Sequence, residues 1–162
     1  MKKIIIVIVF VFAGLSTMNA QRIYHSFESR FVLPSDTPDN RKSGLAISYS
    51  PFFTISKDFR ALKIAPSIGI YYISGGENLY KDDAFFTTIG GAVDFNLDKS
   101  QEISIGGHLG YSVITPEEFD GGLYYRPYIR WGWFMLSYGN VNLKQGNYAT
   151  FQIGLIAMID SY

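Results

Sequence analysis

The segment 85–113 constrains this chain most, because apolar and polar side chains alternate along almost all of it. Its two halves are separated by a polar turn at Asp98, Lys99 and Ser100. A period of two over such lengths predicts two β-strands that form a hairpin. The non-apolar face is also small and rich in glycine, as required for the lumen side of a narrow barrel whose apolar face meets lipid. The apolar face consists of Ile89, Val93, Phe95, Leu97, Ile103, Ile105, Leu109, Tyr111 and Val113.

The same alternation recurs along the chain and predicts eight strands bounded by turn residues. The strands are expected at 22–33, 43–55, 60–74, 84–97, 102–114, 122–131, 134–140 and 148–160. The connections alternate between long ones (34–42, 75–83, 115–121, 141–147) and short ones (56–59, 98–101, 132–133). This asymmetry is typical of outer-membrane barrels, which have short periplasmic turns and longer extracellular loops. We therefore expect an all-β fold, an eight-stranded antiparallel up-and-down transmembrane β-barrel.

Residues 1–20 have the layout of a secretory signal peptide. Lys2 and Lys3 precede an apolar run from Ile4 to Leu15, and the segment ends on the small residue Ala20. This run is too short for a spanning helix, which needs roughly 20 apolar residues. We expect cleavage after Ala20, which leaves 21–162 as the barrel in the outer membrane. An even number of strands places both termini on one side, expected to be the periplasmic one.

The composition excludes several classes of protein. The absence of cysteine excludes a disulfide scaffold, a thiolate metal site, a cysteine nucleophile and a lipid-modified cysteine. Without Lys2 and Lys3 the chain carries 12 basic and 14 acidic residues and no basic cluster, so no nucleic-acid partner is expected. Apolar residues make up 48% of the chain and aromatic residues 17%, which favours strands with a large apolar surface. No cofactor or metal is expected.

Aromatic side chains on the outward parity fall near strand ends, where they predict interfacial girdles. Pro66 and Pro127 conflict with continuous ladders because proline cannot donate a backbone hydrogen bond, so a bulge is expected at each. Small inward residues such as Gly90 and Gly106 argue against a soluble lipocalin-like barrel, which would line its interior with apolar side chains. The predicted girdle residues are Tyr72, Tyr111, Tyr125, Trp131, Phe134 and Tyr138.

With these features the chain resembles the small eight-stranded outer-membrane barrels of Gram-negative bacteria, which include the OmpX-like proteins and the OmpA-type transmembrane domain. The last strand, which ends at Tyr162, is similar to the aromatic-terminated final strand of such barrels, although Tyr162 is out of phase with the apolar face. The resemblance implies a structural or interaction role in the envelope. The implied partners are outer-membrane lipid, lipopolysaccharide and other outer-membrane proteins, with the chain acting as a monomer or as an accessory subunit of a larger complex.

The inward positions predict a charged network that closes the lumen. An eight-stranded barrel has room inside for side chains but not for a continuous water channel. Unpaired charges there would be costly, so we expect them to neutralise one another, with Arg130 paired to Glu102 or Asp160. A gate that opens when the pairs exchange is the functional alternative. The network is predicted from Lys63, Asp94, Glu102, Arg130 and Asp160, with His108 and Arg126 as further interior polar residues.

An enzyme that modifies lipid A, an acyltransferase or a deacylase, is the alternative function. Such barrels place a histidine, a serine and an acidic residue together at the outer-leaflet end. Here His25 falls near the periplasmic side. His108, Ser112 and Glu117 have the required residue types, but Ser112 lies about 13 Å along the strand from His108 at roughly 3.3 Å per residue. That distance exceeds hydrogen-bond reach, so no catalytic site is predicted.

The long loops predict an acidic rim at the outward-facing end of the barrel. The acidic pairs could hold a divalent cation shared with lipopolysaccharide phosphates, since hard cations favour carboxylate oxygens. No loop has the spacing of a calcium-binding motif, so solvated loop charge is the favoured interpretation. The rim is predicted from Asp82, Asp83, Glu117, Glu118 and Asp120.

Overall fold

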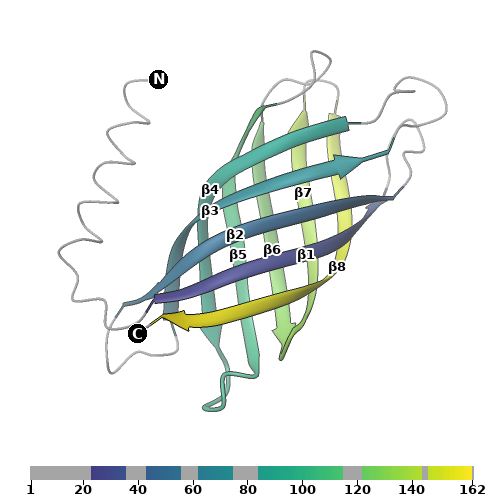
Figure 1. Cartoon of the computed structure of the whole chain (residues 1–162). Helices are drawn as coiled ribbons and strands as arrows, with labels where there is room; N and C mark the ends of the chain where they lie inside the picture. Colours follow the sequence, from purple (N-terminus) through teal and green to yellow (C-terminus); the bar gives the residue numbers. More distant parts are fainter. Residues whose placement is uncertain are drawn as a thin grey trace, which may run out of the picture.

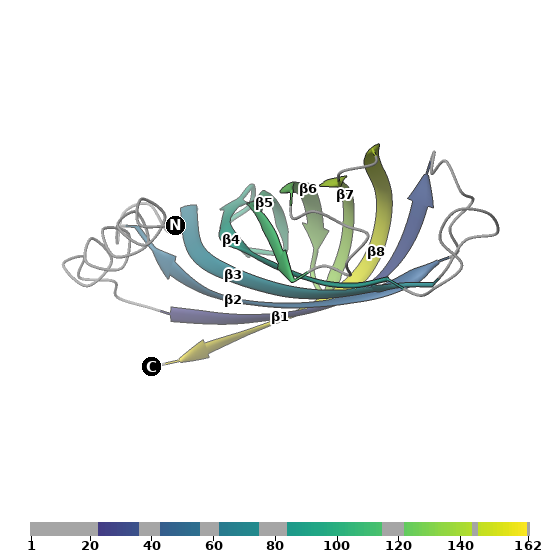
Figure 2. The ribbon, with the colours of Figure 1, turned by 90° about the horizontal axis from the view of Figure 1, so that it is seen from above.

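The computed structural model describes residues 23–35, 43–55, 62–74, 84–114, 122–143 and 146–161. These residues form a closed barrel of eight antiparallel strands, each paired with the next in sequence (Figure 1). β8 returns to pair with β1, and the two strands lie side by side in both views (Figure 1, Figure 2). The predicted eight-stranded up-and-down barrel is confirmed. The strands are β1 Ile23–Ser35, β2 Gly44–Thr54, β3 Leu62–Ile73, β4 Ala84–Asn96, β5 Ile103–Ile114, β6 Leu123–Trp131, β7 Phe134–Leu143 and β8 Gly146–Ser161.

The strand boundaries agree closely with the alternation in the sequence, except at the β7–β8 connection. A long loop was expected at 141–147, but β7 continues to Leu143 and β8 begins at Gly146. The polar residues Asn142 and Asn147 are typical of a loop, which is why a loop was predicted. In the structure they lie opposite each other in the ladder, so the strand pairing extends through them. The expected alternation of connection lengths is therefore wrong at this hairpin. The other predicted long loops lie largely outside the described residues.

The outer wall of the barrel is apolar and the inner wall is polar. Along β6, for example, exposed and buried residues alternate at every position. The girdle aromatics predicted from the sequence are all exposed, with Trp131 at 74%, and Trp133 in the β6–β7 turn is 79% exposed. An apolar wall on all sides would drive association in water, whereas in hydrocarbon it matches its surroundings. The barrel is therefore a transmembrane one. None of the described residues forms a helix long and apolar enough to cross a membrane.

The bulges expected at Pro66 and Pro127 are not found. Pro66 pairs in register with Gly91 of β4, and Pro127 pairs in register with Gly107 of β5. Each proline instead lies where the ladder to its other neighbour lapses, so its missing N–H breaks no ladder bond on that side. The β2–β3 pairs skip from Tyr49↔Ile68 to Phe53↔Ile64, and the β6–β7 pairs skip from Tyr125↔Asn140 to Tyr128↔Ser137. A register shift does occur, at Thr87/Thr88 between β4 and β5.

The β4–β5 turn is built around Asp98. Its carboxylate accepts hydrogen bonds from the Ser100 hydroxyl, the Ile103 backbone N–H at 2.7 Å and the Glu102 backbone N–H at 3.2 Å. The Ser100 hydrogen bond, followed by that of Ile103, lowers the pKa of Asp98 because both favour its charged form. The turn is closed where the Leu97 N–H donates to the Ile103 carbonyl at 2.8 Å. The short connection predicted at 98–101 is therefore a turn organised by one carboxylate.

Candidate functional site in the barrel lumen

Glu28 of β1 is the centre of a buried ionic cluster in the lumen. Its Oε2 accepts a hydrogen bond from Arg126 Nη2 at 2.6 Å and lies 3.3 Å from Arg30 Nη1. Its Oε1 accepts from His108 Nε2 at 3.1 Å. The hydroxyl of Ser48 donates to Oε2 at 3.3 Å, while Arg30 Nη2 donates to Ser48 at 2.6 Å. One carboxylate thus joins β1, β2, β5 and β6 across the lumen.

Glu28 and Arg30 were not among the interior residues predicted from the sequence, although the signal was present. Along β1 the buried Ser26, Glu28 and Arg30 alternate with the exposed Phe27 and Phe31. This is the same period of two that located the hairpin 85–113. The inward charges of the first strand could therefore have been found by the same rule.

Asp94 of β4 is the centre of a second buried cluster. Its carboxylate lies 3.3 Å from Lys63 Nζ and 3.9 Å from Arg130 Nε. It also accepts hydrogen bonds from Ser104 Oγ at 2.8 Å and from Tyr128 OH at 2.9 Å. Lys63, Asp94 and Arg130, three residues of the predicted network, therefore lie together.

Arg130 differs from the prediction in its partner. It was expected to pair with Glu102 or Asp160, but its described ion pair is with Asp94. Glu102 is exposed, because it precedes β5 at the turn rather than lying inside the barrel. Asp160 is half-buried on β8, opposite Tyr24 of β1. The Arg130 guanidinium instead donates to the Gln101 carbonyl at 3.1 Å, the Gly132 carbonyl at 3.2 Å and Ser104 Oγ at 2.9 Å.

The buried charges do not neutralise one another as fully as expected. Among the described residues, Glu28 and Asp94 are the buried acids, whereas Arg30, Lys63, Arg126 and Arg130 are the buried bases. Aromatic faces lie against three of these cations and stabilise them through the negative face of the ring. The distances to the ring centroids are 5.2 Å from Arg30 to Tyr71, 5.2 Å from Lys63 to Tyr24 and 5.6 Å from Arg126 to Tyr128.

An apolar and aromatic layer lies next to the Glu28 cluster. Tyr71 stacks on Phe86 with ring centroids 4.7 Å apart, and its hydroxyl is hydrogen-bonded to that of Tyr124. Val32, Ala46 and Ile73 complete this buried layer. Beside His108 the lumen has a cavity of about 10 Å³, which is at the lower limit for one water molecule. The large inward side chains Arg30, Lys63, Tyr71 and Arg126 are almost fully buried, so they fill the described part of the lumen.

His108 also belongs to a chain of hydrogen bonds that the sequence reasoning missed. The Ser67 hydroxyl of β3 lies 2.9 Å from His108 Nδ1, and His108 Nε2 donates to Glu28. Ser112, the serine considered from the sequence, lies on the same strand as His108, whereas Ser67 reaches His108 from β3, over the intervening β4. Serine, histidine and a carboxylate in series are the residue types of a nucleophilic hydrolase.

Three observations argue against hydrolysis by the hydrogen-bonded series of Ser67, His108 and Glu28. The adjacent cavity of about 10 Å³ has no room for an acyl group. Ser67 also accepts a hydrogen bond from Ser50 at 2.9 Å, and the Glu28 carboxylate is shared with two arginines. His25, the other histidine considered, lies on the outer wall with its Nδ1 2.7 Å from Tyr49 OH. These hydrogen bonds satisfy the buried polar groups of Ser67, His108 and Glu28.

The predicted acidic rim, Asp82, Asp83, Glu117, Glu118 and Asp120, lies outside the described residues. Within the described ranges no group of three or more histidine, cysteine, aspartate or glutamate side chains is placed to hold a metal ion.

The closed barrel with its apolar wall and charged lumen has the fold of the small eight-stranded outer-membrane β-barrels, as the sequence resemblance predicted. Two solved structures of the Yersinia pestis outer membrane protein Ail are similar to it. One, a backbone structure in a phospholipid bilayer nanodisc, aligns with a TM-score of 0.54 at 12% identity over 84% of this chain and 99% of Ail. The other, a crystal structure of this attachment invasion locus protein, aligns with a TM-score of 0.51 at 15% identity over 85% and 97%. No protein-family model and no curated protein sequence matches the chain.

Proposed function

We propose that this protein is a closed, non-enzymatic outer-membrane barrel with a structural or interaction role in the cell envelope. The observation that carries the proposal is the filled lumen, in which Glu28 and Asp94 each bind side chains from several strands. A lumen of this kind holds no continuous column of water. The wall, in contrast, supplies an apolar surface that other envelope components can contact.

A solute-permeation assay tests closure. Purified barrel is reconstituted into liposomes loaded with a small fluorescent sugar, and leakage is compared with that from protein-free liposomes. We expect equal leakage, because neither ionic cluster opens without leaving buried charges unpaired. Faster leakage with the barrel present would support a pore, or the gate in which the ion pairs exchange.

The non-enzymatic part of the proposal rests on the lack of substrate space beside Ser67 and His108. The two Ail structures above are of a protein named for attachment and invasion rather than for an enzymatic activity. Incubation of the folded barrel with lipid A, followed by mass spectrometry, tests the alternative of an acyltransferase or deacylase. Unchanged lipid A masses are expected, and a mass change of one acyl chain would overturn the proposal.

The route to the envelope is also proposed. We infer that residues 1–20 are removed as a signal peptide and that both ends of the mature chain face the periplasm. The pairing of Ile23 with Ser161 supports a common side for the two ends. N-terminal sequencing of the membrane-inserted protein should begin at Gln21. Protease added to intact cells should leave a C-terminal tag uncut, and cleavage of that tag would reverse the orientation.

The proposed partners are outer-membrane lipid, lipopolysaccharide and other outer-membrane proteins. Native purification in mild detergent, followed by identification of co-purifying molecules, separates a barrel that works alone from an accessory subunit of a larger complex. A stoichiometric protein partner would establish the accessory role.

A further inference from the structure

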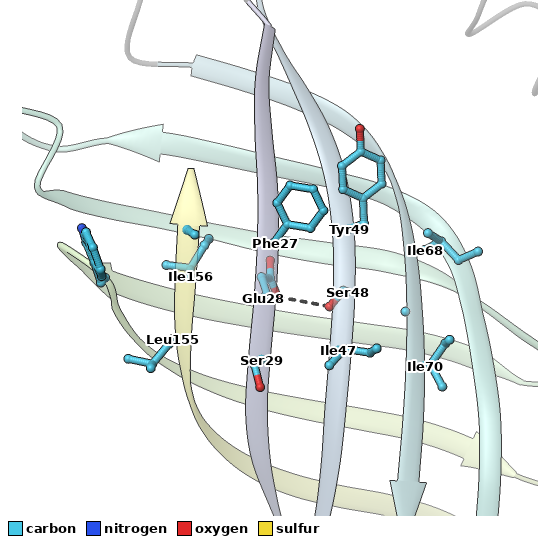
Figure 3. A pocket seen from close by; sticks show the side chains of 13 residues that line it. Phe27, Glu28, Ser29, Ile47, Ser48, Tyr49, Ile68, Ile70, Leu155 and Ile156 are labelled. Carbon is cyan, nitrogen blue, oxygen red and sulfur yellow. Dashed lines mark hydrogen bonds between the residues drawn. The ribbon is translucent and has the colours of Figure 1, made fainter. Parts of the chain in front are cut away.

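The outer wall carries a groove of about 570 Å³ that crosses β8, β1, β2 and β3 (Figure 3). This volume is in the range of sites that bind small molecules. The groove is almost entirely apolar at its sides. Its walls are formed by Trp133, Leu155, Phe27, Ile47, Ile68 and Ile70.

The groove exists because small outward-facing residues lie between large ones. Ser29 of β1 is opposite both Ile47 of β2 and Leu155 of β8. Ala157 of β8 is the next small outward residue and lies opposite Phe27. The small side chains of Ser29 and Ala157 therefore form the floor of the groove, and the larger side chains of the neighbouring strands form its sides.

Trp133 forms one end wall, and the backbone fixes its place. The Ile156 N–H donates to the Trp133 carbonyl at 2.9 Å, which holds the β6–β7 turn against β8. The indole, which is 79% exposed, lines the groove together with Leu155.

The end of the groove nearest the chain termini is polar. Tyr49, a lining residue, directs its hydroxyl away from Ile47 (Figure 3), and this hydroxyl lies 2.7 Å from His25 Nδ1. The two rings are stacked with centroids 6.0 Å apart. When Tyr49 donates to Nδ1, the other ring nitrogen of His25, Nε2, carries a hydrogen that can be donated further. Among the described residues, the hydrogen-bond partner found for the His25 ring is the Tyr49 hydroxyl.

We propose that this groove binds one diacyl phospholipid of the leaflet nearest the chain termini. An acyl chain lies between Trp133 and Ile68, and the phosphate accepts a hydrogen bond from His25 Nε2. The wall faces hydrocarbon, so the molecules that reach it are lipids. A phospholipid matches the polarity of the groove. Its acyl chains are apolar like the sides of the groove, and its phosphate is a hydrogen-bond acceptor for the end of the groove at which His25 and Tyr49 lie.

A photoactivatable phosphatidylethanolamine with a diazirine in one acyl chain tests the apolar part. The full mature barrel is reconstituted with this probe, irradiated and digested, and adducts are mapped by mass spectrometry. Adducts should be several-fold more frequent on peptides containing Ser29 and Ala157 than on the β4–β5 wall around Gly91. Even labelling around the barrel would reduce the groove to ordinary lipid contact and overturn the proposal.

The variant Ser29→Leu/Ala157→Leu fills the floor of the groove, and Gly91→Leu is its matched control. Both place leucine at exposed outward positions, and a Cβ at Gly91 would have the Ala65 carbonyl, at 3.6 Å, as its one neighbour within 4 Å. Circular dichroism first verifies that both are folded. Filling the groove should lower its labelling to the level of the other walls, while Gly91→Leu leaves groove labelling unchanged. Unchanged labelling of the filled groove, or crosslinks there between two barrels, would overturn the proposal.

His25→Phe tests the polar end, because it keeps an aromatic ring and removes the ring nitrogens. Phospholipid labelling of the groove should become about tenfold weaker, the effect of losing one hydrogen bond to a charged group. A diacylglycerol probe with the same diazirine chain should label wild type and His25→Phe equally. If both probes lose labelling equally, or neither does, His25 does not recognise the phosphate.

Discussion

Arg126 Nη2 of β6 lies 2.6 Å from Glu28 Oε2 of β1, and both side chains are buried in the lumen. These strands are not neighbours in the barrel, so the contact crosses the lumen. A bond of this kind closes the interior in a way that the ladders between adjacent strands cannot.

Glu28→Ala should destabilise the barrel by about 3–5 kcal/mol, because it leaves Arg30 and Arg126 buried without their shared carboxylate. Urea unfolding in lipid vesicles measures the change. Glu102→Ala, at an exposed position, is the control and should remain within about 0.5 kcal/mol of wild type. Equal stability of the two variants would mean that the Glu28 cluster contributes nothing.

Gly106→Ala should cost about 1–3 kcal/mol through overpacking. A Cβ at this position would lie 2.4 Å from the Tyr128 ring and 2.3 Å from the Val93 carbonyl, so Tyr128 could not keep its hydrogen bond to Asp94. Gly91→Ala, with 3.6 Å of clearance, should be neutral or slightly stabilising. The two unfolding curves should separate clearly, and coincident curves would show that the lumen adapts freely around Tyr128.

Ser67→Ala should lower stability by about 0.5–1.5 kcal/mol, since His108 Nδ1 loses its hydroxyl partner. Because Ser67 has no substrate space beside it, wild type should not react with an alkyl fluorophosphonate probe. Covalent labelling of wild type that disappears in Ser67→Ala would instead identify Ser67 as a nucleophile.

The β4–β5 turn should weaken at acid pH through Asp98. The pKa of Asp98 is lowered in the folded state by the hydrogen bonds from Ser100 and Ile103, so the unfolded chain binds the proton more readily. The stabilisation is fully present above the ordinary aspartate pKa of 3.8 and is lost as pH falls through the lower folded value. Amide exchange of Leu97 and Ile103 should accelerate in that range relative to Asp98→Asn, whose exchange should lack this dependence. Identical pH profiles would contradict the role of the carboxylate.

Strand positions could be predicted from the sequence because the period of two depends only on neighbouring residues. The exposed face of Ile89 and Leu109 and the inward position of His108 followed from it. The prediction of a long β7–β8 loop was wrong because Asn142 and Asn147 are residue types typical of loops, whereas in the structure they pair with each other as strand residues.

The lumen was harder to predict, because its contacts join strands that are far apart in the sequence. Ser67 of β3 meets His108 of β5 over the intervening β4, and Arg130 of β6 meets Asp94 of β4 rather than Glu102. Such pairs depend on strand register and on the width of the barrel, and the alternation of apolar and polar residues along one strand predicts neither. The prolines illustrate the same limit, since Pro66 and Pro127 lie at gaps in the ladder rather than at bulges.

Single-channel recording in a planar lipid bilayer tests the central claim, that the lumen is closed by the Glu28 and Asp94 clusters, most directly. The folded wild-type barrel, inserted at neutral pH under applied voltage, should give a flat baseline with no steps. Steady or stepwise ion conductance from the wild-type protein would contradict the closed lumen.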